Sequence, residues 1–466
     1  MQYLYISNNG WMKILVKIVF ISFLFIGFTS CENEKTDARQ ETVEILPENK
    51  LPQVNINTNG GTIVDEPKIE AQMTITVNDE IDFDGKIGIE IRGSSSQAFP
   101  KKQFGLEIWD ETNDGIDASL LGFPEEEDWI LYSPYSDKAL IRNVLIYDLS
   151  RDIGRYASRV KFVDVSINGE YNGLYVLMEK LKRDDNRIDI SKLKPDEISG
   201  EDLTGGYILK LDKADGPDET LYTEATSITS TYAPNDANAG QHIYFLYDTP
   251  KAKDIVTEQK DYITNYMRGF EDALAGDNFA DPDTGYAKYI DAPSFIDFFL
   301  LNELSNNVDG FRLSTWLVKD KNGKLQMGPI WDFNLAFGNA NYCGGGDADV
   351  WTYKFNSRCP GDFWQIPFWW DRLLQDPAFV AQLQVRWQEL RDGPFSNAVV
   401  MSKINAYVER LTLAGAIQHN FEKWPVLGQY VWPNNFVGNS YSEEIDYLKD
   451  WINQRLNWLD NAIMEL

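Results

Sequence analysis

Histidine is almost absent from this chain, with only His242 and His419 among its 466 residues. A Ser-His-Asp triad needs an imidazole base, and a histidine-rich zinc site needs several imidazoles, so neither kind of site is expected. Acid–base chemistry must then come from Asp, Glu or Lys side chains. A metal site would be rich in oxygen ligands, which favour Mg²⁺, Mn²⁺ or Ca²⁺.

Positive charge is also scarce. The chain has 43 Lys and Arg residues against 72 Asp and Glu residues, which gives a formal net charge of -29 at pH 7. Such a surface repels polyanions, so neither nucleic acid nor an anionic membrane surface is expected as a direct partner. A polyanionic substrate would need metal ions or a local basic patch to compensate for this charge.

Only three cysteines are present, and the first of them, Cys31, ends an N-terminal apolar segment. Lys13 and Lys17 form a short basic region before an apolar run that is short for a membrane span. A transmembrane anchor is the alternative, but the pattern favours a lipoprotein signal peptide at residues 1–31, with Cys31 as the lipidated first mature residue. Residues 32–50 are polar and predicted to form a flexible tether. The protein is therefore expected outside the cytoplasm, anchored by lipid to a bacterial membrane, at the outer membrane or cell surface.

The other two cysteines, Cys343 and Cys359, flank a loop that contains three consecutive glycines. In an oxidising compartment they can form a disulfide that closes this loop. Two free thiols remain the alternative, because the sequence does not prove that the two residues lie close together.

Hydrophobic periodicity predicts strands mainly in the first half of the mature chain and helices mainly in the second. Strands are predicted at Gln53–Asn57, Gln72–Val77, Lys86–Ile91, Phe104–Ile108, Val160–Ile167, Leu174–Glu179, Gly206–Leu211 and His242–Tyr247. Helices are predicted at Ser136–Ile153, Asp254–Leu274, Ser294–Leu304, Phe363–Gln375, Pro377–Arg391, Asn397–Trp424 and Ser442–Met464. Without internal repeats, this order indicates one α+β unit of two lobes, a β-rich lobe at about 51–248 and a helix-rich lobe at about 249–466.

Two aspartates, Asp309 and Asp332, lie on either side of a predicted β-hairpin. Its strands, Leu313–Lys319 and Leu325–Ile330, are separated by a turn that contains Asn-Gly, a strong hairpin signal. Since Asp309 precedes the first strand and Asp332 follows the second, both carboxylates are expected at the same end of the hairpin. Adjacent antiparallel strands are about 5 Å apart, so the two carboxylates should converge on one small volume.

Three interpretations fit such a pair. In phosphoryl transfer, one carboxylate orients the acceptor hydroxyl and the other holds a metal ion on the phosphates. In glycoside hydrolysis the pair acts as acid and nucleophile or base. In a purely structural role, both are turn or capping residues. The order of a buried helix, Asp309, a hairpin and Asp332-Phe333 matches the layout of the catalytic and metal-binding loops of protein kinases, although the surrounding letters differ.

A loop that suits phosphate binding precedes these aspartates. Residues 92–102 (RGSSSQAFPKK) join two predicted strands and combine hydroxyl groups, backbone N–H groups and basic ends. No helix is predicted directly after the loop, so it is not a Walker loop, and an ordinary β-turn is the alternative.

Several motifs in this order resemble the CotH (spore coat protein H) family of atypical secreted kinases, over nearly the whole mature chain. The motifs are Arg92-Gly93-Ser94-Ser95 with Pro100-Lys101-Lys102, Asp137-Lys138 with Ile141-Arg142-Asn143, Asn168-Gly169-Glu170-Tyr171 with Gly173, Tyr175 and Glu179, Asn307-Val308-Asp309, and Ile330-Trp331-Asp332-Phe333-Asn334 with Phe337-Gly338. The resemblance implies a two-lobed fold similar to a protein kinase, with ATP and Mg²⁺ or Mn²⁺ between the lobes. It also implies phosphorylation of Ser or Thr on a secreted protein.

The resemblance further implies roles for individual residues. Asp309 matches the catalytic aspartate and Asp332 the metal-binding one. Either Lys101 or Lys102 resembles the basic group that contacts phosphate, Glu179 looks like its partner carboxylate, and Arg92 lines the nucleotide side.

One position departs from the family pattern. Ser314 stands where many members carry a metal-binding asparagine, and its hydroxyl is a ligand with a weaker dipole than an amide carbonyl. The alternative function is therefore a catalytically weak or inactive surface module that binds protein or glycan, with aromatic side chains as stacking platforms. In either case a monomer is expected.

Overall fold

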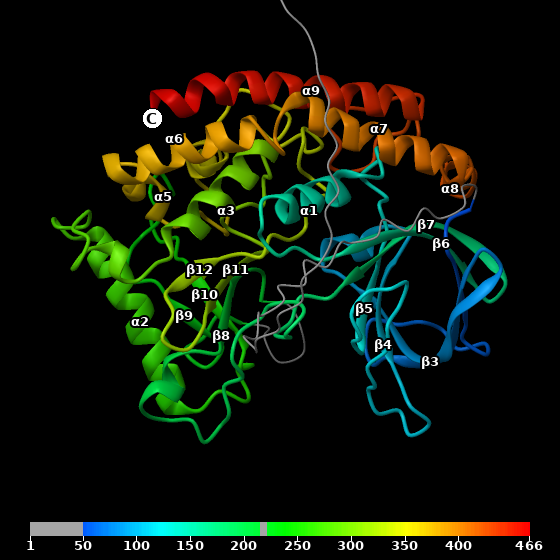
Figure 1. Cartoon of the computed structure of the whole chain (residues 1–466), viewed down its shortest axis with the longest axis horizontal. Helices are drawn as coiled ribbons and strands as arrows, with labels where there is room; N and C mark the ends of the chain where they lie inside the picture. Colours follow the sequence, from blue (N-terminus) through cyan, green and yellow to red (C-terminus); the bar gives the residue numbers. More distant parts are fainter. Residues whose placement is uncertain (1–49, 215–220) are drawn as a thin grey trace, which may run out of the picture. The chain divides into compact units, whose positions relative to one another are not determined.

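The computed structural model describes residues 50–214 and 221–466 (Figure 1). The predicted signal peptide, the lipidation site Cys31 and nearly all of the predicted tether lie outside these residues. In the part that is described, no helix is long and apolar enough to cross a membrane. The described residues all belong to one compact unit.

Seven strands from the first part of this unit form a closed barrel in the order β1-β2-β3-β4-β5-β7-β6. The strands are β1 (Gln53–Asn57), β2 (Ile69–Val77), β3 (Glu80–Arg92), β4 (Gln103–Ile108), β5 (Asp128–Tyr132), β6 (Val160–Ile167) and β7 (Glu170–Glu179). Neighbouring strands are antiparallel except β1 and β6, whose parallel pairing closes the barrel. Alternate side chains such as Val54, Ile75 and Ile89 fill its interior, as the two-residue period of a strand requires.

A second sheet has five strands in the order β12-β11-β8-β10-β9. The strands are β8 (Tyr207–Leu211), β9 (Ser227–Thr229), β10 (Tyr244–Thr249), β11 (Thr315–Lys319) and β12 (Leu325–Met327). The pairing of Leu317 with Met327 and of Lys319 with Leu325 confirms the predicted hairpin. Because β11 also pairs with β8, this sheet joins strands from both sides of residue 248. The end of β8 is thereby placed beside the two-aspartate hairpin.

Helices dominate the later part of the chain, and one further helix lies between β5 and β6 in the sequence. They are α1 (Arg142–Asp152), α2 (Thr257–Ala275), α3 (Ala292–Ser305), α4 (Phe355–Arg358), α5 (Trp369–Leu373), α6 (Pro377–Arg391), α7 (Asn397–Leu413), α8 (Ala416–Lys423) and α9 (Tyr441–Ala462). The central helix α3 packs against α6 and α9, while α8 packs on β7 of the barrel (Figure 1). The mixed α+β class, β-rich first and helical second, is as predicted.

Several predicted boundaries were wrong for identifiable reasons. The helix expected from Ser136 begins only at Arg142, whose backbone N–H donates to Asp137 Oδ2 at 2.9 Å. Ser294 does not cap α3, because Asp291 accepts the Ser294 N–H at 3.1 Å and so occupies the N-cap position. The long helix expected at Asn397–Trp424 is split at Gly415, whose φ of 67° is accessible to glycine without strain.

Candidate active site

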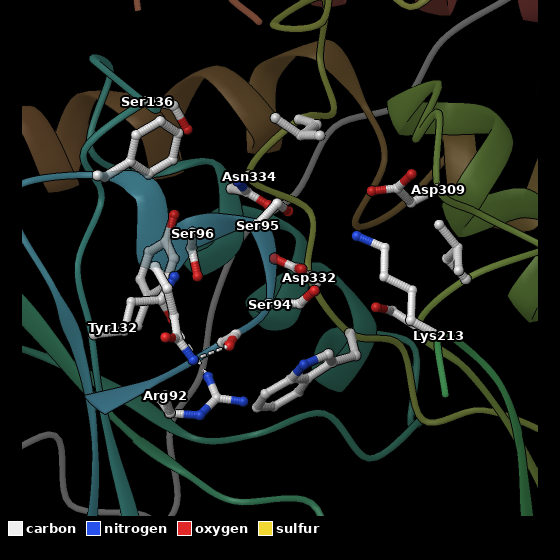
Figure 2. Close-up of a pocket in the computed structure, with 18 of the residues that line it drawn as sticks. Arg92, Ser94, Ser95, Ser96, Tyr132, Ser136, Lys213, Asp309, Asp332 and Asn334 are labelled. Atoms are coloured by element: carbon white, nitrogen blue, oxygen red, sulfur yellow. Dashed lines mark hydrogen bonds between the residues drawn. The ribbon is translucent and has the colours of Figure 1, made fainter. Parts of the chain in front are cut away.

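A cavity of about 760 Å³ lies where the end of β3, helix α1 and the end of β8 meet the residues that precede β11 and follow β12. Figure 2 shows its polar side chains pointing into a common space. Polar residues that line it are Arg92, Ser94, Ser95, Ser96, Tyr132, Asn143, Asp212, Lys213, Asp309, Ser314, Asp332 and Asn334. The hairpin therefore brings Asp309 and Asp332 to one cavity, as the sequence predicts.

Asp332 leaves the hairpin in a left-handed conformation, with φ of 60°. Helix α1 holds this backbone from behind. The Asp332 N–H donates to Tyr147 Oη at 3.1 Å, and the N–H of Phe333 donates to Asn143 Oδ1 at 2.7 Å. These bonds support a backbone conformation that a non-glycine residue rarely adopts, and they aim the carboxylate into the cavity.

The surroundings of Asp332 favour a bound cation. Burial above all, together with the nearby carboxylates of Asp309 and Asp212, raises the pKa of Asp332 to about 6, while the charges of Arg92 and Lys213 oppose the shift. Like charges held this close repel one another. A divalent cation placed among them would relieve that repulsion and favour the ionised form of Asp332.

Asp309 stands on the loop between α3 and β11 and remains reachable, since its side chain is 18% exposed. Its Oδ1 accepts a hydrogen bond from Arg312 Nη2 at 2.9 Å, and its backbone N–H donates to Asn307 Oδ1 at 3.2 Å. Among the described residues, no hydrogen bond reaches its second oxygen, Oδ2. One oxygen is thus held in place, and the other can accept a proton or a hydrogen bond from a hydroxyl group.

Three cations line the cavity, Arg92, Lys213 and Lys210, of which Lys210 also pairs with Asp248. Arg92 ends β3, where its Nη1 donates to Gln103 Oε1 at 3.3 Å and its guanidinium lies 5.8 Å from the centre of the Trp331 ring. Burial lowers the pKa of Arg92, and the charge of Asp332 opposes this effect. Lys213 follows β8 and lines the same space. Together they form the local basic patch that a polyanionic ligand needs on an acidic protein.

The loop after Arg92 is built for close approach. Gly93 has φ of 102°, and a Cβ atom there would lie 2.1 Å from Ser96 Oγ, so only glycine fits. The hydroxyl groups and backbone of Ser94 to Ser96 line the cavity beside Arg92. Such a loop suits phosphate oxygens.

Comparison with a protein-family model identifies the family of the chain. The family model described as CotH kinase protein matches residues 89–459, from within β3 to within α9. The chain belongs to the CotH kinase family. No curated protein matches the chain. At the level of the family, membership supports a kinase-like enzyme, and such enzymes generally use ATP and a divalent metal.

Three residues that the CotH resemblance assigned to the nucleotide do not line the cavity. Lys101 is buried elsewhere, where Nζ donates to the Leu174 carbonyl at 2.6 Å and to Asn420 Oδ1 at 2.8 Å. Lys102 Nζ donates at 2.6 Å to the carbonyl of Gln97, which follows Ser94–Ser96 (the serine loop) and itself lines the cavity. The ammonium group of each lysine is thus engaged with the protein rather than pointed at Asp332.

Glu179, expected as the partner of one of these lysines, is paired with a different cation. It forms an ion pair with Arg159 and accepts a hydrogen bond from Tyr156 Oη at 3.1 Å. Leu174, the contact of Lys101, lies five residues earlier on β7, which corresponds to roughly 16 Å along the strand. The structure therefore separates Glu179 from Lys101.

The contacts of Lys101 lead to a test. Replacing Lys101 with methionine should lower the free energy of unfolding by about 1–3 kcal/mol, because the Leu174 carbonyl loses its buried donor. It should leave nucleotide affinity unchanged, which urea unfolding and a nucleotide titration would check. A large loss of nucleotide affinity in a folded Lys101→Met protein would restore the role that the family resemblance implied.

Ser314 and a carboxylate that the sequence did not single out, Asp212, lie on the Asp332 side of the cavity. Ser314 lines the cavity, and its backbone N–H donates to Asp212, whose pKa is raised by burial. Asp212 follows β8, and only the pairing of β8 with β11 brings it to the hairpin. The sequence signal was weak: a charged pair, Asp212-Lys213, at the end of a predicted strand.

The ligand set fits magnesium or manganese bound together with phosphates. In the described part of the chain, the only three acidic side chains with oxygens all within 4.8 Å are Glu126, Glu127 and Asp128, and Lys182 bonds to all three. Asp212, Asp309 and Asp332 are more widely spaced. Mg²⁺ usually takes one or two carboxylates plus phosphate oxygens and waters, so a tight carboxylate cage is not required.

Proposed function

We propose that the protein transfers the γ-phosphate of ATP, with Mg²⁺ or Mn²⁺, to Ser or Thr hydroxyl groups of an extracytoplasmic protein. The observation that carries this proposal is the convergence of Asp309, Asp332 and Arg92 on one cavity in a chain of the CotH kinase family. The proposed arrangement is kinase-like, with the barrel and the helical part as two lobes around the nucleotide.

In this proposal the two aspartates have different tasks. Asp332, with Ser314 and Asp212 beside it, holds the divalent metal, which when bound neutralises charge on the phosphates. Asp309 orients the acceptor hydroxyl through its unbonded oxygen and receives its proton. Arg92, Lys213 and the hydroxyl groups of Ser94 to Ser96 bind phosphate oxygens. The negative field of the protein is thus compensated where the nucleotide binds.

Glycoside hydrolysis is the weaker alternative. A carboxyl group with a pKa of about 6 beside a second carboxylate also suits an acid–base pair. The positive groups Arg92 and Lys213 and the serine loop have no task in that reaction, whereas each contacts phosphate in the proposed one. The family match favours the kinase as well.

We also propose an extracytoplasmic place for the protein, held at a bacterial membrane through lipid on Cys31. The disulfide between Cys343 and Cys359 supports this, since such bonds persist in oxidising compartments. A membrane-proximal kinase of this kind would act on neighbouring surface proteins, as a monomer. Mass spectrometry of the N-terminal peptide would detect a diacylglyceryl group on Cys31, and an unmodified signal segment in the mature protein would contradict the anchor.

Ligand binding offers the first test. ATP together with Mn²⁺ should raise the melting temperature of the full chain by several °C at ligand concentrations about 100-fold above Kd. The rise should disappear on chelation with EDTA, because the metal joins Asp332 to the phosphates. Mn²⁺ alone and ATP with EDTA are the controls. An unchanged melting temperature with saturating ATP and Mn²⁺ would count against the nucleotide site.

A further inference from the structure

Arg312 lies three residues after Asp309 and is held on several sides. It is 3% exposed, and its guanidinium lies 3.9 Å from the centre of the Phe355 ring. Nε donates to the Val308 carbonyl at 2.8 Å, Nη2 to Asp309 Oδ1 at 2.9 Å, and Nη1 to Asp362 Oδ1 at 3.3 Å. One buried guanidinium is therefore shared between two carboxylates, Asp309 inside the active cavity and Asp362 outside it.

This sharing determines what Asp309 can do. Arginine binds a single carboxylate most strongly through two parallel hydrogen bonds. Because Asp362 takes one amino group of Arg312, Asp309 is held through one oxygen only and its Oδ2 stays available. Without Asp362, Nη1 would keep only the Trp364 carbonyl, 3.3 Å away, and the guanidinium could turn toward Asp309 and engage both of its oxygens.

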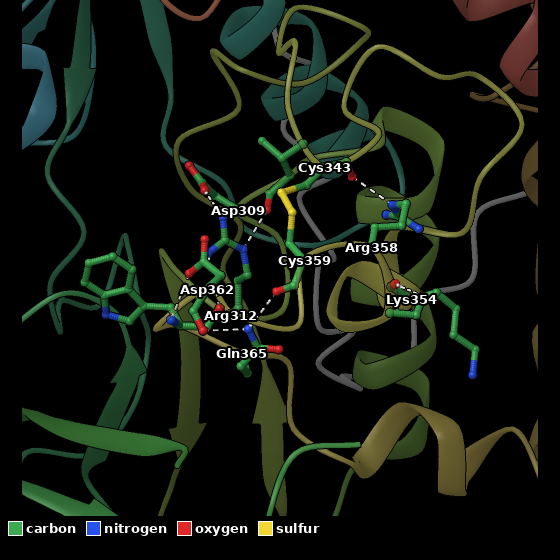
Figure 3. The surroundings of a disulfide bond; sticks show 11 residues. Asp309, Arg312, Cys343, Lys354, Arg358, Cys359, Asp362 and Gln365 are labelled. Carbon is green, nitrogen blue, oxygen red and sulfur yellow. Dashed lines mark hydrogen bonds and ion pairs between the residues drawn. A yellow bond between two sulfur atoms is a disulfide. The ribbon is translucent and has the colours of Figure 1, made fainter. Parts of the chain in front are cut away.

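Asp362 is in turn fixed to the disulfide between Cys343 and Cys359 (Figure 3). Its backbone N–H donates to the Cys359 carbonyl at 3.1 Å. The side-chain amide of Gln365 donates to the carbonyl groups of both Cys359 and Asp362, at 3.0 and 2.7 Å. The position of Asp362 therefore follows the position of Cys359.

The other end of the disulfide rests on the residues just before Asp309. Asn306 ends α3 and donates from Nδ2 to the Gly344 carbonyl at 2.8 Å. Gly345 packs so closely on Val308 that an added Cβ would lie 2.5 Å from Val308 Cγ1. The loop closed by the disulfide thus contacts the residues before the aspartate through Gly344 and Gly345. The segment that directly follows Cys359 contacts Arg312, after the aspartate, through Asp362.

We propose that Arg312 and Asp362 are positioning residues for Asp309, and that the Cys343–Cys359 disulfide holds them in place, so that phosphorylation of the acceptor depends on the oxidised bond. This inference rests on the proposed function, in which Asp309 is the group on the acceptor side. Opening the bond takes two electrons and two protons from a thiol or phosphine reductant and yields two cysteine thiols. In the part of the chain that the structure describes, Arg92 and Asp332 share no hydrogen bond or ion pair with this loop, so the nucleotide side is expected to keep its affinity.

Steady-state kinetics of the full chain with ATP and casein tests the inference. The variants are Asp362→Asn, which retains the disulfide but removes the charge that competes with Asp309 for Arg312, and the double variant Cys343→Ser/Cys359→Ser. Both should lower kcat by about a hundredfold while the KM for ATP stays unchanged, as expected when a reacting group is misplaced by about 1 Å. Asp362→Glu should recover part of kcat, and reduction of the wild type should reproduce the loss.

Asp371→Asn is the matched control. Asp371 lies on α5, pairs with Lys354 and has a similar side-chain exposure (21% against 27% for Asp362). Among the described residues it forms no hydrogen bond or ion pair with Arg312. It should keep the wild-type kcat. Wild-type kcat in both Asp362→Asn and the double cysteine variant would overturn the inference, as would an equal loss in Asp371→Asn.

Amide hydrogen exchange separates this inference from the proposed function. Residues 308–313 should exchange faster in Asp362→Asn and in the double cysteine variant, since the bond from the Leu313 N–H to the Asp309 carbonyl, 2.9 Å long, loses its support. Unchanged exchange there overturns the inference, whatever the activity. Faster exchange in the variants, combined with a wild-type protein that transfers no phosphate, would uphold the positioning roles and contradict the kinase function.

Discussion

Asp332→Asn should abolish binding of ATP with Mn²⁺ and at the same time stabilise the ligand-free protein. In the folded state burial and neighbouring carboxylates raise the pKa of this group from 3.8 to about 6. The folded protein therefore binds a proton more tightly than the unfolded chain, and its stability falls as the pH rises from about 4 through 6. At pH 7.5 the ionised carboxylate of Asp332 lowers the stability of the folded wild type by the full amount, about 2–3 kcal/mol. Asparagine removes this destabilisation.

The measurement is thermal unfolding at several pH values with and without ATP and Mn²⁺. Without ligand, the variant should melt a few °C above the wild type at pH 7.5, with the difference vanishing near pH 4. With ligand, only the wild type should gain stability. Asp164→Asn is the matched control, because burial also raises the pKa of Asp164, in the barrel strand β6. An Asp332→Asn protein with a wild-type ligand response would remove Asp332 from the metal site.

Asp309→Asn should have the second large effect, a loss of about 10²–10⁴ in kcat with ATP binding retained. Asparagine keeps the shape and can still accept the Arg312 hydrogen bond, but it cannot take the proton of the acceptor hydroxyl. The KM for ATP should stay within about twofold, since binding of the phosphates is assigned to Arg92, Lys213 and the metal.

Asp320→Asn provides the comparison for Asp309. Asp320 lies at the turn end of the same hairpin, where its Oδ1 accepts the N–H of Ser191 at 2.9 Å. This substitution should leave kcat unchanged, because the turn is at the far end of β11 from the cavity. Should Asp309→Asn instead weaken ATP binding and spare kcat, the two aspartates would have to exchange roles.

Local sequence was sufficient to predict the hairpin and its two aspartates. The Asn-Gly turn and the flanking β-formers set the register, and the register alone placed Asp309 and Asp332 at one end. The buried helix before Asp309 was equally clear from its apolar sequence. These features depend on contacts between residues close in the chain, which is why they could be read without a structure.

Features that depend on distant pairing were missed or misplaced. Asp212 joins the site only because β8 pairs with β11, some hundred residues later in the chain. Neither Lys101 nor Lys102 lines the cavity, because their ammonium groups are engaged by single contacts, with Asn420 and with the Gln97 carbonyl. The strand β5 was not predicted, although all of its residues are buried, because a continuous apolar run of this length has no diagnostic period.

Transfer of radiolabelled phosphate from ATP to casein, or to the protein itself, tests the central claim most directly. We predict that the full chain with Mn²⁺ or Mg²⁺ incorporates label, that EDTA prevents it, and that Asp309→Ala and Asp332→Ala each lose it. Incorporation that survives unchanged in both variants, or its absence from the wild-type protein with metal and ATP present, would contradict the assignment of this cavity as a kinase active site.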